Sequence, residues 1–392
     1  MKLKIAILGT RGIPNSYGGF EQAAQFISAG LVERGHDVTV YNSELNPYKE
    51  NKWKGVDIVH CKDPENWLGT VGQFIYDLNC VLHARKQSFD VWIFFGYTSS
   101  SIWGRLYPRQ ATIISNMDGL EWKRSKYARP VQRFLQYAEK LAIKYSEAYI
   151  ADSVFIQSYL KNKYQVSSKY IPYGAEISNE ENKSILEQLG IEERKYFVAM
   201  ARMEPENNIE IILKGFTQSN STHKFLVIGN HQNKFGRKIL KTYKNDPRII
   251  FIGALFDQVI LRTIRKYCLV YFHGHSVGGT NPSLLEAMAD KALIAAHDNS
   301  FNRAVLGNDV MYFSGPYDTR QIVDSAKLSE ENKEQADRNF QKIKKFYSWG
   351  KIITAYETFI LQSFLQNRSV NKVLTVEKKL AINQKIQEAT EN

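Results

Sequence analysis

The sequence has few cysteines, and none is spaced for a metal site or a disulfide framework. Cys61, Cys80 and Cys268 are the only three in 392 residues, and neither a CxxC pair nor a cysteine–histidine pair with zinc spacing occurs. An odd number of widely separated cysteines is typical of reduced thiols. We therefore expect a cytoplasmic protein with no metal site and no bound cofactor.

Long apolar runs are also missing. No window approaches the roughly eighteen apolar residues that a membrane-spanning helix needs. The run that follows Met1, Leu3–Leu8, is too short for the apolar region of a signal peptide. We therefore expect neither a membrane span nor a secretion signal.

Acidic residues are fewer than basic ones. Lys and Arg number 52 against 40 Asp and Glu, which leaves a net charge of +12. Such an excess suits a nucleotide, a phospholipid surface or a nucleic acid. No recognised nucleic-acid module is present, so we expect no nucleic-acid partner. A hydrophobic content of 43% indicates a globular protein, and a chain of 392 residues favours two domains.

The first glycine-rich loop lies between a strand and a helix. Leu3–Leu8 predicts the strand, Gly18 and Gly19 end the loop, and Phe20–Arg34 has helical apolar spacing before the next strand, Val38–Tyr41. This βαβ order predicts a parallel sheet with ligands at the carboxyl ends of its strands. The glycines match neither G-x-G-x-x-G nor a P-loop, but they allow a phosphate or a sugar to come close.

Strands and helices continue to alternate in both halves of the chain. In the first half we expect strands at 57–60, 91–95, 112–115 and 149–151, and helices at 67–85, 131–145 and 153–163. In the second half we expect strands at 197–200, 225–228, 249–252 and 269–272, and helices at 209–218, 235–243 and 257–267. The pattern predicts two doubly wound α/β domains, residues 1–175 and 176–345. A C-terminal helix at 346–366 and a polar segment at 367–392, an extra helix or a loose tail, would follow them.

The most informative stretch is a second strand, glycine loop and helix. Leu269–Phe272 predicts a buried strand, and Gly278 and Gly279 follow it in a tight loop. A helix then begins near Pro282, a residue that suits the first helical turn. This order presents unpaired backbone N–H groups to a phosphate.

The cap and the first acid of this helix add to the signal. Thr280 or Asn281 is placed to cap the helix. Glu286, about one turn in, puts a carboxylate where it can accept the two hydroxyls of a ribose. An ordinary βα turn is the alternative, but two adjacent glycines, a cap and an acid favour a binding site.

Two features of the first half have a functional and a structural interpretation. Asp118 follows the strand Thr112–Ser115, at the edge where α/β sheets place working residues, but an Asp before Gly119 is also common in turns. The segment Trp122–Lys144 alternates basic with aromatic and apolar residues. It can lie on an anionic membrane, or form a solvated helix whose apolar side enters the core.

Taken together, four motifs resemble the GT-B glycosyltransferases, in particular family 4, the retaining nucleotide-sugar transferases. The motifs are residues 18–21, 116–124, 201–209 and 274–288, and the resemblance extends from Lys4 to about Phe359. They are most similar to the subgroup that includes bacterial polysaccharide rhamnosyltransferases. The resemblance implies two Rossmann-like domains that face each other across a cleft.

The resemblance also assigns roles to single residues. Arg202 matches a basic residue on the donor diphosphate, and Glu286 matches the second acid of an E-x7-E motif, which holds the ribose. The phosphate-cradling backbone corresponds to Gly279, Thr280 and Asn281, and the N-terminal loop that closes on donor and acceptor corresponds to Gly18 and Gly19, with Phe20 beside them. Trp349 resembles the residue at which the C-terminal helix crosses back to the first domain.

Three positions depart from the family pattern. The first acid of E-x7-E is Gly278, so contacts to the sugar must come from elsewhere, with backbone N–H groups and His275 as candidates. A lysine expected after Arg202 is Asn207, for which Arg11 is a candidate replacement. Asp118 stands where the family often has histidine, and we expect it to orient the sugar or the acceptor.

These observations predict a hexosyltransferase. We expect retaining, metal-independent transfer, foremost of L-rhamnose from dTDP-rhamnose or of a hexose from a UDP-hexose. The acceptor would be a lipid-linked glycan or a polysaccharide at the inner face of the cytoplasmic membrane, with peripheral contact to anionic lipid.

Three rival functions remain. A nucleotide-sugar 2-epimerase shares the two-domain form and a Gly-Thr-Arg after the first strand, as at 9–11. An oxidoreductase would use Tyr159 and Lys163, but no dinucleotide fingerprint precedes them. A non-enzymatic membrane scaffold would explain the basic surface but not two phosphate-type loops.

Overall fold

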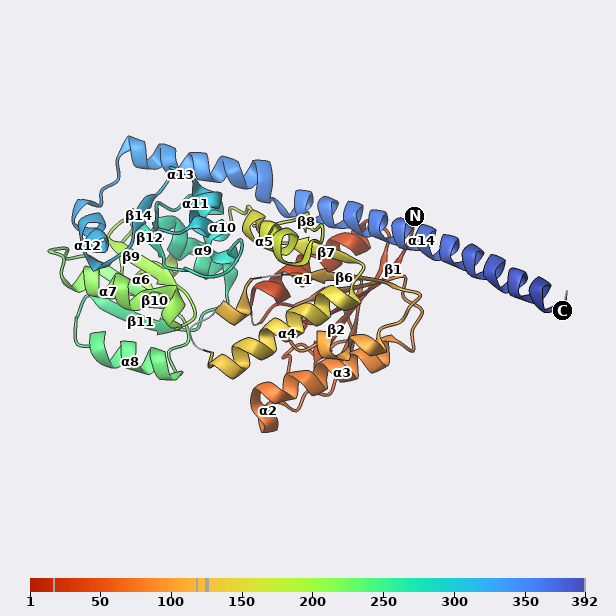
Figure 1. The fold of residues 1–392 in the computed structure, drawn as a ribbon. Helices are drawn as coiled ribbons and strands as arrows, with labels where there is room; N and C mark the ends of the chain where they lie inside the picture. The colour runs from red at the N-terminus through yellow and green to blue at the C-terminus, as the bar shows by residue number, and fades with distance from the viewer. Residues whose placement is uncertain (17, 118, 124–126, 391–392) are drawn as a thin grey trace.

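The fold consists of two sheets, each covered by helices on both faces, and their strands are parallel except for β3 at the edge of the first sheet. A computed structural model describes residues 1–16, 18–117, 119–123 and 127–390, the last 21 of these by their backbone alone. In the described chain, one sheet has eight strands in the order β3-β4-β2-β1-β5-β6-β7-β8, and the other has six in the order β11-β10-β9-β12-β13-β14 (Figure 1). The predicted α/β class with two Rossmann-like domains is confirmed.

The first sheet uses residues 4 to 170. Its strands are β1 (Lys4–Leu8), β2 (Asp37–Ser43), β3 (Lys52–Trp53), β4 (Val56–Cys61), β5 (Val91–Phe95), β6 (Thr112–Asn116), β7 (Ala148–Ala151) and β8 (Lys169–Tyr170). The helices are α1 (Gly19–Glu33), α2 (Glu65–Leu68), η1 (Gly69–Val71), α3 (Gly72–Ala84), η2 (Ser101–Leu106), η3 (Glu121–Lys123), α4 (Arg129–Tyr145) and α5 (Val154–Tyr164). All five residues of β5 are buried, as expected for a strand with helices on both faces.

The second sheet uses residues 196 to 313. Its strands are β9 (Tyr196–Met200), β10 (Lys224–Ile228), β11 (Ile249–Gly253), β12 (Val270–His273), β13 (Ile294–His297) and β14 (Met311–Phe313). The helices are α6 (Ser184–Gln188), η4 (Pro205–Asn207), α7 (Ile209–Thr217), α8 (Lys234–Tyr243), α9 (Gln258–Tyr267), α10 (Pro282–Ala289), α11 (Ser300–Leu306), α12 (Pro316–Ser325) and α13 (Glu330–Lys342). A π-helical turn, η5 (Ile343–Tyr347), leads into the long helix α14 (Trp349–Thr390).

Each sheet reverses its strand order at one place. In the first sheet the order turns between β1 and β5, and in the second between β9 and β12. At such a switch point the connecting loops leave in opposite directions, so a crevice opens at the carboxyl ends of the two strands. Both predicted glycine loops follow strands at these points, after β1 and after β12.

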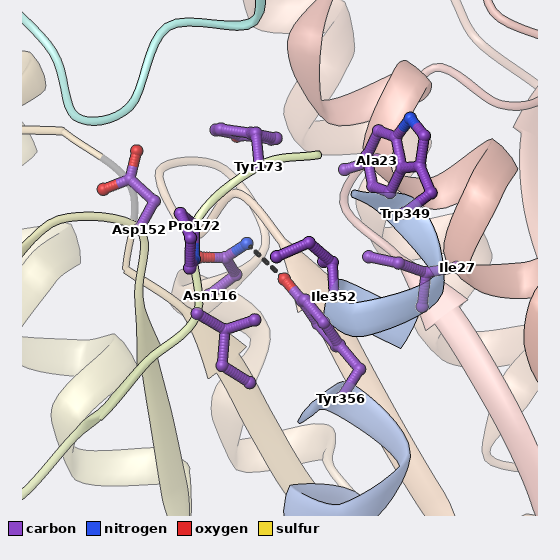
Figure 2. Close-up of a pocket in the computed structure, with 10 residues that line it drawn as sticks. Ala23, Ile27, Asn116, Asp152, Pro172, Tyr173, Trp349, Ile352 and Tyr356 are labelled. Carbon is purple, nitrogen blue, oxygen red and sulfur yellow. Dashed lines mark hydrogen bonds between the residues drawn. The ribbon is translucent and has the colours of Figure 1, made fainter. Parts of the chain in front are cut away.

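Helix α14 returns from the second sheet to the first (Figure 1). The ring of Trp349 stacks on Phe26 of α1, with centroids 4.5 Å apart, and fills the space beside Gly174. Further along, the hydroxyl of Tyr356 accepts a hydrogen bond from Asn116 at the end of β6 (Figure 2). Trp349, the residue at which the crossing was expected, thus lies against α1 of the first domain.

The helix expected over residues 67–85 is interrupted, which corrects that prediction. The chain forms the short helix α2, the 3₁₀ turn η1 and then α3. Gly69 has φ +56°, a left-handed conformation that favours glycine and ends α2. Apolar residues occur on both sides of Gly69, which resembled one continuous helix, although α3 buries one side and α2 buries none of its residues.

Asp77 lies buried on the inner side of α3 and gives a testable pH effect. Ser99 Oγ donates to Asp77 Oδ2 at 2.5 Å, but burial dominates and raises the pKa of Asp77 to about 7. The folded state therefore binds more protons than the unfolded state between about pH 4 and 7, and stability falls as the pH rises through this window. We expect Asp77→Asn to stabilise the protein by about 2 kcal/mol at pH 8 and to lose this advantage at pH 4. Urea unfolding at the two pH values measures the difference; an equal effect at both would contradict the assignment.

Candidate active site

The loop after β12 is held tightly by the loop after β9. The backbone N–H and the Oγ of Ser276 both donate to the Glu206 carbonyl, at 3.0 and 2.8 Å. A Cβ on Gly274 would lie 2.1 Å from the Asn207 carbonyl, so only glycine fits there. Gly278 has φ +131°, a conformation that strains other residues, and a Cβ at this position would meet no atom within 4 Å. The predicted glycine loop is therefore rigid at its base and open at its tip.

Helix α10 begins as the sequence predicts. Asn281, one of the two candidate caps, accepts from the Ser283 backbone N–H at 3.0 Å, and Pro282 is the first helical residue. The other candidate, Thr280, instead donates through Oγ1 to the Asp152 carbonyl at 2.6 Å. The N-terminal end of α10 is thus free of its own side chains apart from the cap, and it lies against the end of β7.

Gly279 touches the first domain directly. A Cβ at this position would lie 1.9 Å from an Asp152 carboxylate oxygen, so the absence of a side chain lets the two domains meet. Asp152 follows β7 and is 1% exposed. Gly19, at the start of α1, similarly faces Pro282, whose Cγ would lie 3.2 Å from a Cβ on the glycine. Both glycine loops therefore meet at the N-terminal end of α10.

Glu286 is held from two sides. Its Oε2 accepts from Arg265 Nη1 at 2.9 Å, and its Oε1 accepts from Gln22 Nε2 of α1 at 2.7 Å. Arg265 is 3% exposed and also donates through Nε to Asp290 Oδ2 at 2.6 Å. The buried arginine sets the orientation of the Glu286 carboxylate, which keeps lone pairs for further hydroxyl donors.

Arg202 and Glu21 form the other half of this arrangement. Arg202 is exposed just after β9, and within the described residues its guanidinium makes no hydrogen bond or ion pair. Glu21 is 4% exposed and accepts from the Arg11 backbone N–H at 2.8 Å. Burial raises the pKa of Glu21, while this hydrogen bond and the charges of Arg11 and Arg202 oppose the rise.

Glu286 is tied to the first turn of α1, where Gln22 donates a hydrogen bond to it. The charge of Arg202 opposes the rise in the pKa of Glu21, the residue before Gln22. The candidate site thus offers an exposed guanidinium, an open glycine loop, a helix N-terminus and an oriented carboxylate. This combination can hold an anion together with a group that bears two hydroxyls.

The histidines after β12 pack on one another. The rings of His273 and His275 are stacked with centroids 4.4 Å apart. Burial, with the nearby His275 and His297, lowers the pKa of His273, so this imidazole is neutral at physiological pH. The His275 carbonyl accepts from Asn299 and Asn302, at 3.0 and 3.1 Å, which fixes the backbone that leads to Gly278.

Other residues singled out in the sequence lie elsewhere. Phe20 packs its ring edge-on against Phe95 and beside Gly96, at the end of the first sheet. Asn207 is buried and donates to the Arg202 carbonyl at 2.8 Å, so it shapes the loop. Asp118 lies outside the described residues.

Arg11, the candidate replacement for the missing lysine, forms an ion pair with α2, and its proposed role at the diphosphate stays a prediction. Its guanidinium donates twice to the Glu65 carboxylate of α2, with Nη2 to Oε1 at 2.8 Å. The pair is neutral as a unit, and its geometry ties α2 to the loop after β1.

The sequence gave no role to four side chains at this site: Glu21, Gln22, Asp152 and Arg265. Glu21 ends the motif 18–21 and Gln22 follows it, which was a usable signal. Asp152 follows a predicted strand, the same signal that drew attention to Asp118. Nothing in the sequence marked Arg265, because its partners Glu286 and Asp290 lie on a different helix.

The described residues contain neither a candidate metal site nor a helix that could span a membrane. No group of three or more His, Cys, Asp and Glu side chains is placed to hold a metal ion. Of the described helices, none combines the length and the apolar character that crossing a bilayer requires.

Comparison with known proteins gives a family match for each half of the chain. Residues 2–176 match a domain of unknown function, DUF1972, and residues 181–346 match glycosyl transferases group 1. A search of curated proteins finds no match to the chain.

Solved structures resemble almost the whole chain in fold. Sucrose-phosphate synthase from Thermosynechococcus elongatus has a TM-score of 0.77 at 13% identity, with 93% of this chain and 100% of that one covered. HepE from Anabaena, solved with UDP and glucose, has a TM-score of 0.71 at 13% identity, covering 92% and 100%. TarM from S. aureus, solved with UDP, has a TM-score of 0.68 at 10% identity, covering 92% and 99%. The match of residues 181–346 to glycosyl transferases group 1 favours a glycosyltransferase over an epimerase.

Proposed function

We infer from a GT-B fold along the chain and a group 1 glycosyl transferase match at residues 181–346 that this protein is a glycosyltransferase, and we propose that it transfers a hexose from a nucleotide sugar. L-rhamnose from dTDP-rhamnose is the first candidate donor, and a UDP-hexose is the second. The proposed acceptor is a lipid-linked glycan or a polysaccharide at the inner face of the cytoplasmic membrane. The observation that carries the proposal is the Glu286 carboxylate, held by Gln22 and Arg265 on the helix that follows the open glycine loop.

The donor diphosphate would lie between Arg202 and the N-terminal end of α10. Breaking the anomeric C–O bond moves negative charge onto the leaving diphosphate. The Arg202 guanidinium and the backbone N–H groups of Gly279, Thr280 and Asn281 are the groups that would neutralise that charge. We propose that they do so without a metal ion.

The nucleoside would bind at Glu286. Its carboxylate already accepts from Arg265 and Gln22, and it has capacity for the two ribose hydroxyls. Arg265 is a positioning residue in this scheme, because it acts on the donor only through Glu286.

The sugar would lie over Gly278, where the structure leaves open space. We propose that Glu21, together with the backbone around His275, makes the sugar contacts that an acid at position 278 would otherwise make. Retention of configuration follows in this proposal if the leaving phosphate takes the acceptor proton on the same face. Asp118 would then orient the sugar or the acceptor.

A donor screen tests the proposal. The purified protein is mixed with dTDP-rhamnose, UDP-glucose and GDP-mannose, each with and without a lipid-linked acceptor. Thermal shift reports binding by mass action, and NMR of the product reports its anomeric configuration. If no nucleotide sugar binds, is hydrolysed or is transferred, the proposal is wrong. An inverted product would contradict retention alone.

Substitution of Glu21 tests its assignment. We expect Glu21→Gln to lower kcat by about tenfold or more with little change in melting temperature, because the amide keeps the shape but loses the charge that meets the sugar. Glu33→Gln at the far end of α1 serves as the control. Unchanged kcat in Glu21→Gln would show that the carboxylate only shapes the loop through Arg11.

A further inference from the structure

Helix α3 carries an apolar stripe on the side that faces away from the core. Val71, Ile75, Leu78 and Leu82 are spaced by four, three and four residues, so they share one side of the helix. Val71 is 61%, Ile75 37% and Leu82 40% exposed. The opposite side is buried through Tyr76, Cys80 and Ala84. A helix that is apolar on both sides is normally covered on both.

Trp67 and Leu68 of α2 extend this stripe at its N-terminal end. Trp67 is 88% exposed and Leu68 is 48% exposed. The left-handed turn at Gly69 directs the chain from α2 into α3 and keeps the two segments adjacent. The Trp67 indole and the four aliphatic side chains of the stripe together form one continuous apolar surface.

The neighbouring helix α4 carries a basic stripe on its outer side. Arg129, Arg133, Lys140 and Lys144 repeat at helical spacing, and all are exposed. Tyr137, 55% exposed, lies among them. Within α3 and α4, which the structure describes in full, the only acids are Asp77 and Glu139, and both are buried. The outer surface of this pair is therefore cationic without exposed negative charge.

The two helices are in contact, so the stripes form one surface. The rings of Phe74 in α3 and Phe134 in α4 meet edge to face, with centroids 5.5 Å apart, and α2, α3 and α4 lie together in Figure 1. The same surface is connected to the candidate active site. Glu65 of α2 binds the Arg11 guanidinium, and the Arg11 backbone N–H binds Glu21.

We propose that α2, α3 and α4 form a membrane-docking surface for an anionic lipid bilayer, with Trp67 and the α3 stripe inserted between headgroups and the α4 cations on the lipid phosphates. Aromatic and aliphatic side chains beside lysines and arginines are the combination that binds such interfaces. The charge complementarity selects an anionic bilayer over a protein partner that is merely apolar. The proposal extends the proposed function, since docking here would bring the cleft to a lipid-linked acceptor.

Flotation with vesicles tests the surface on the full-length protein. We expect binding to vesicles of phosphatidylcholine mixed with phosphatidylglycerol and little binding to phosphatidylcholine alone. Val71→Ser/Ile75→Ser and Arg133→Glu/Lys140→Glu should each weaken binding about tenfold or more. A matched control, Tyr317→Ser/Lys327→Glu, also removes an exposed aromatic and reverses a charge, but on the second domain, and should bind normally. Melting temperature and UDP binding show that each variant is folded.

Three outcomes would overturn the proposal. The first is wild-type protein that stays unbound with anionic vesicles. The second is equal binding to neutral vesicles with no effect of the α4 substitutions. The third is a dimer in solution that the α3 substitutions dissociate, which would make the stripe an interface between copies. Wild-type protein that binds anionic vesicles but transfers no sugar to a soluble acceptor would contradict the transferase proposal and not the docking surface.

Discussion

Replacing Arg202 with alanine is expected to lower kcat by about a hundredfold or more. The guanidinium is exposed beside the glycine loop and, within the described residues, bonds to no other side chain. A guanidinium without a bonded partner at the proposed diphosphate position can neutralise the negative charge that develops on the leaving group. Its removal therefore acts on the transition state more than on the folded protein, and the melting temperature should change little.

Matched substitutions separate charge from geometry at this position. Arg202→Lys keeps the charge but not the planar fork, so we expect intermediate kcat. Arg237→Ala removes an exposed arginine from α8 of the same domain and should leave kcat unchanged. A rise in KM alone in Arg202→Ala would mean that the arginine binds donor equally in the ground state and the transition state.

Replacing Arg265 with methionine is expected to destabilise the protein by about 3–5 kcal/mol, the cost of breaking a buried ion pair from one side. The arginine is 3% exposed and donates to both Glu286 and Asp290. Among the described side chains, the substitution therefore leaves Asp290 with only Arg262, 3.6 Å away, and Glu286 with only Gln22. Glu286 would also lose its orientation. We therefore expect weaker nucleotide binding at temperatures at which the variant remains folded. Urea unfolding and UDP titration measure the two effects.

An exposed arginine provides the comparison. Arg303 forms a similar forked pair with Asp298, but it is 51% exposed, and Arg303→Met should not change stability measurably. The double variant Arg265→Met/Asp290→Asn should recover part of the loss, because one of the stranded charges is then neutral. If Arg265→Met were as stable as the wild type, the pair would not position Glu286, and its proposed role would fall.

Much of the fold was predictable because its signals are local. The strand at Val91–Phe95 matches β5 in both bounds, and Asn281 and Pro282 cap and begin α10 as predicted. Helical and strand periods, glycines and caps act over a few residues, so they can be read from the chain. The break at Gly69 was missed because the left-handed turn leaves the apolar spacing on both sides unchanged.

The sequence by itself determined the α/β class, the two glycine loops at the carboxyl ends of their strands, and Arg202 and Glu286 as candidates. Only the tertiary structure joined Gln22 to Glu286 and Glu21 to the Arg11 backbone, put Arg265 behind Glu286, and paired Arg11 with Glu65. It also set the outward stripe of α3 beside the basic side of α4. Such pairings join residues that are far apart in the chain, and their energy comes from burial and charge, which arise only when the chain has folded.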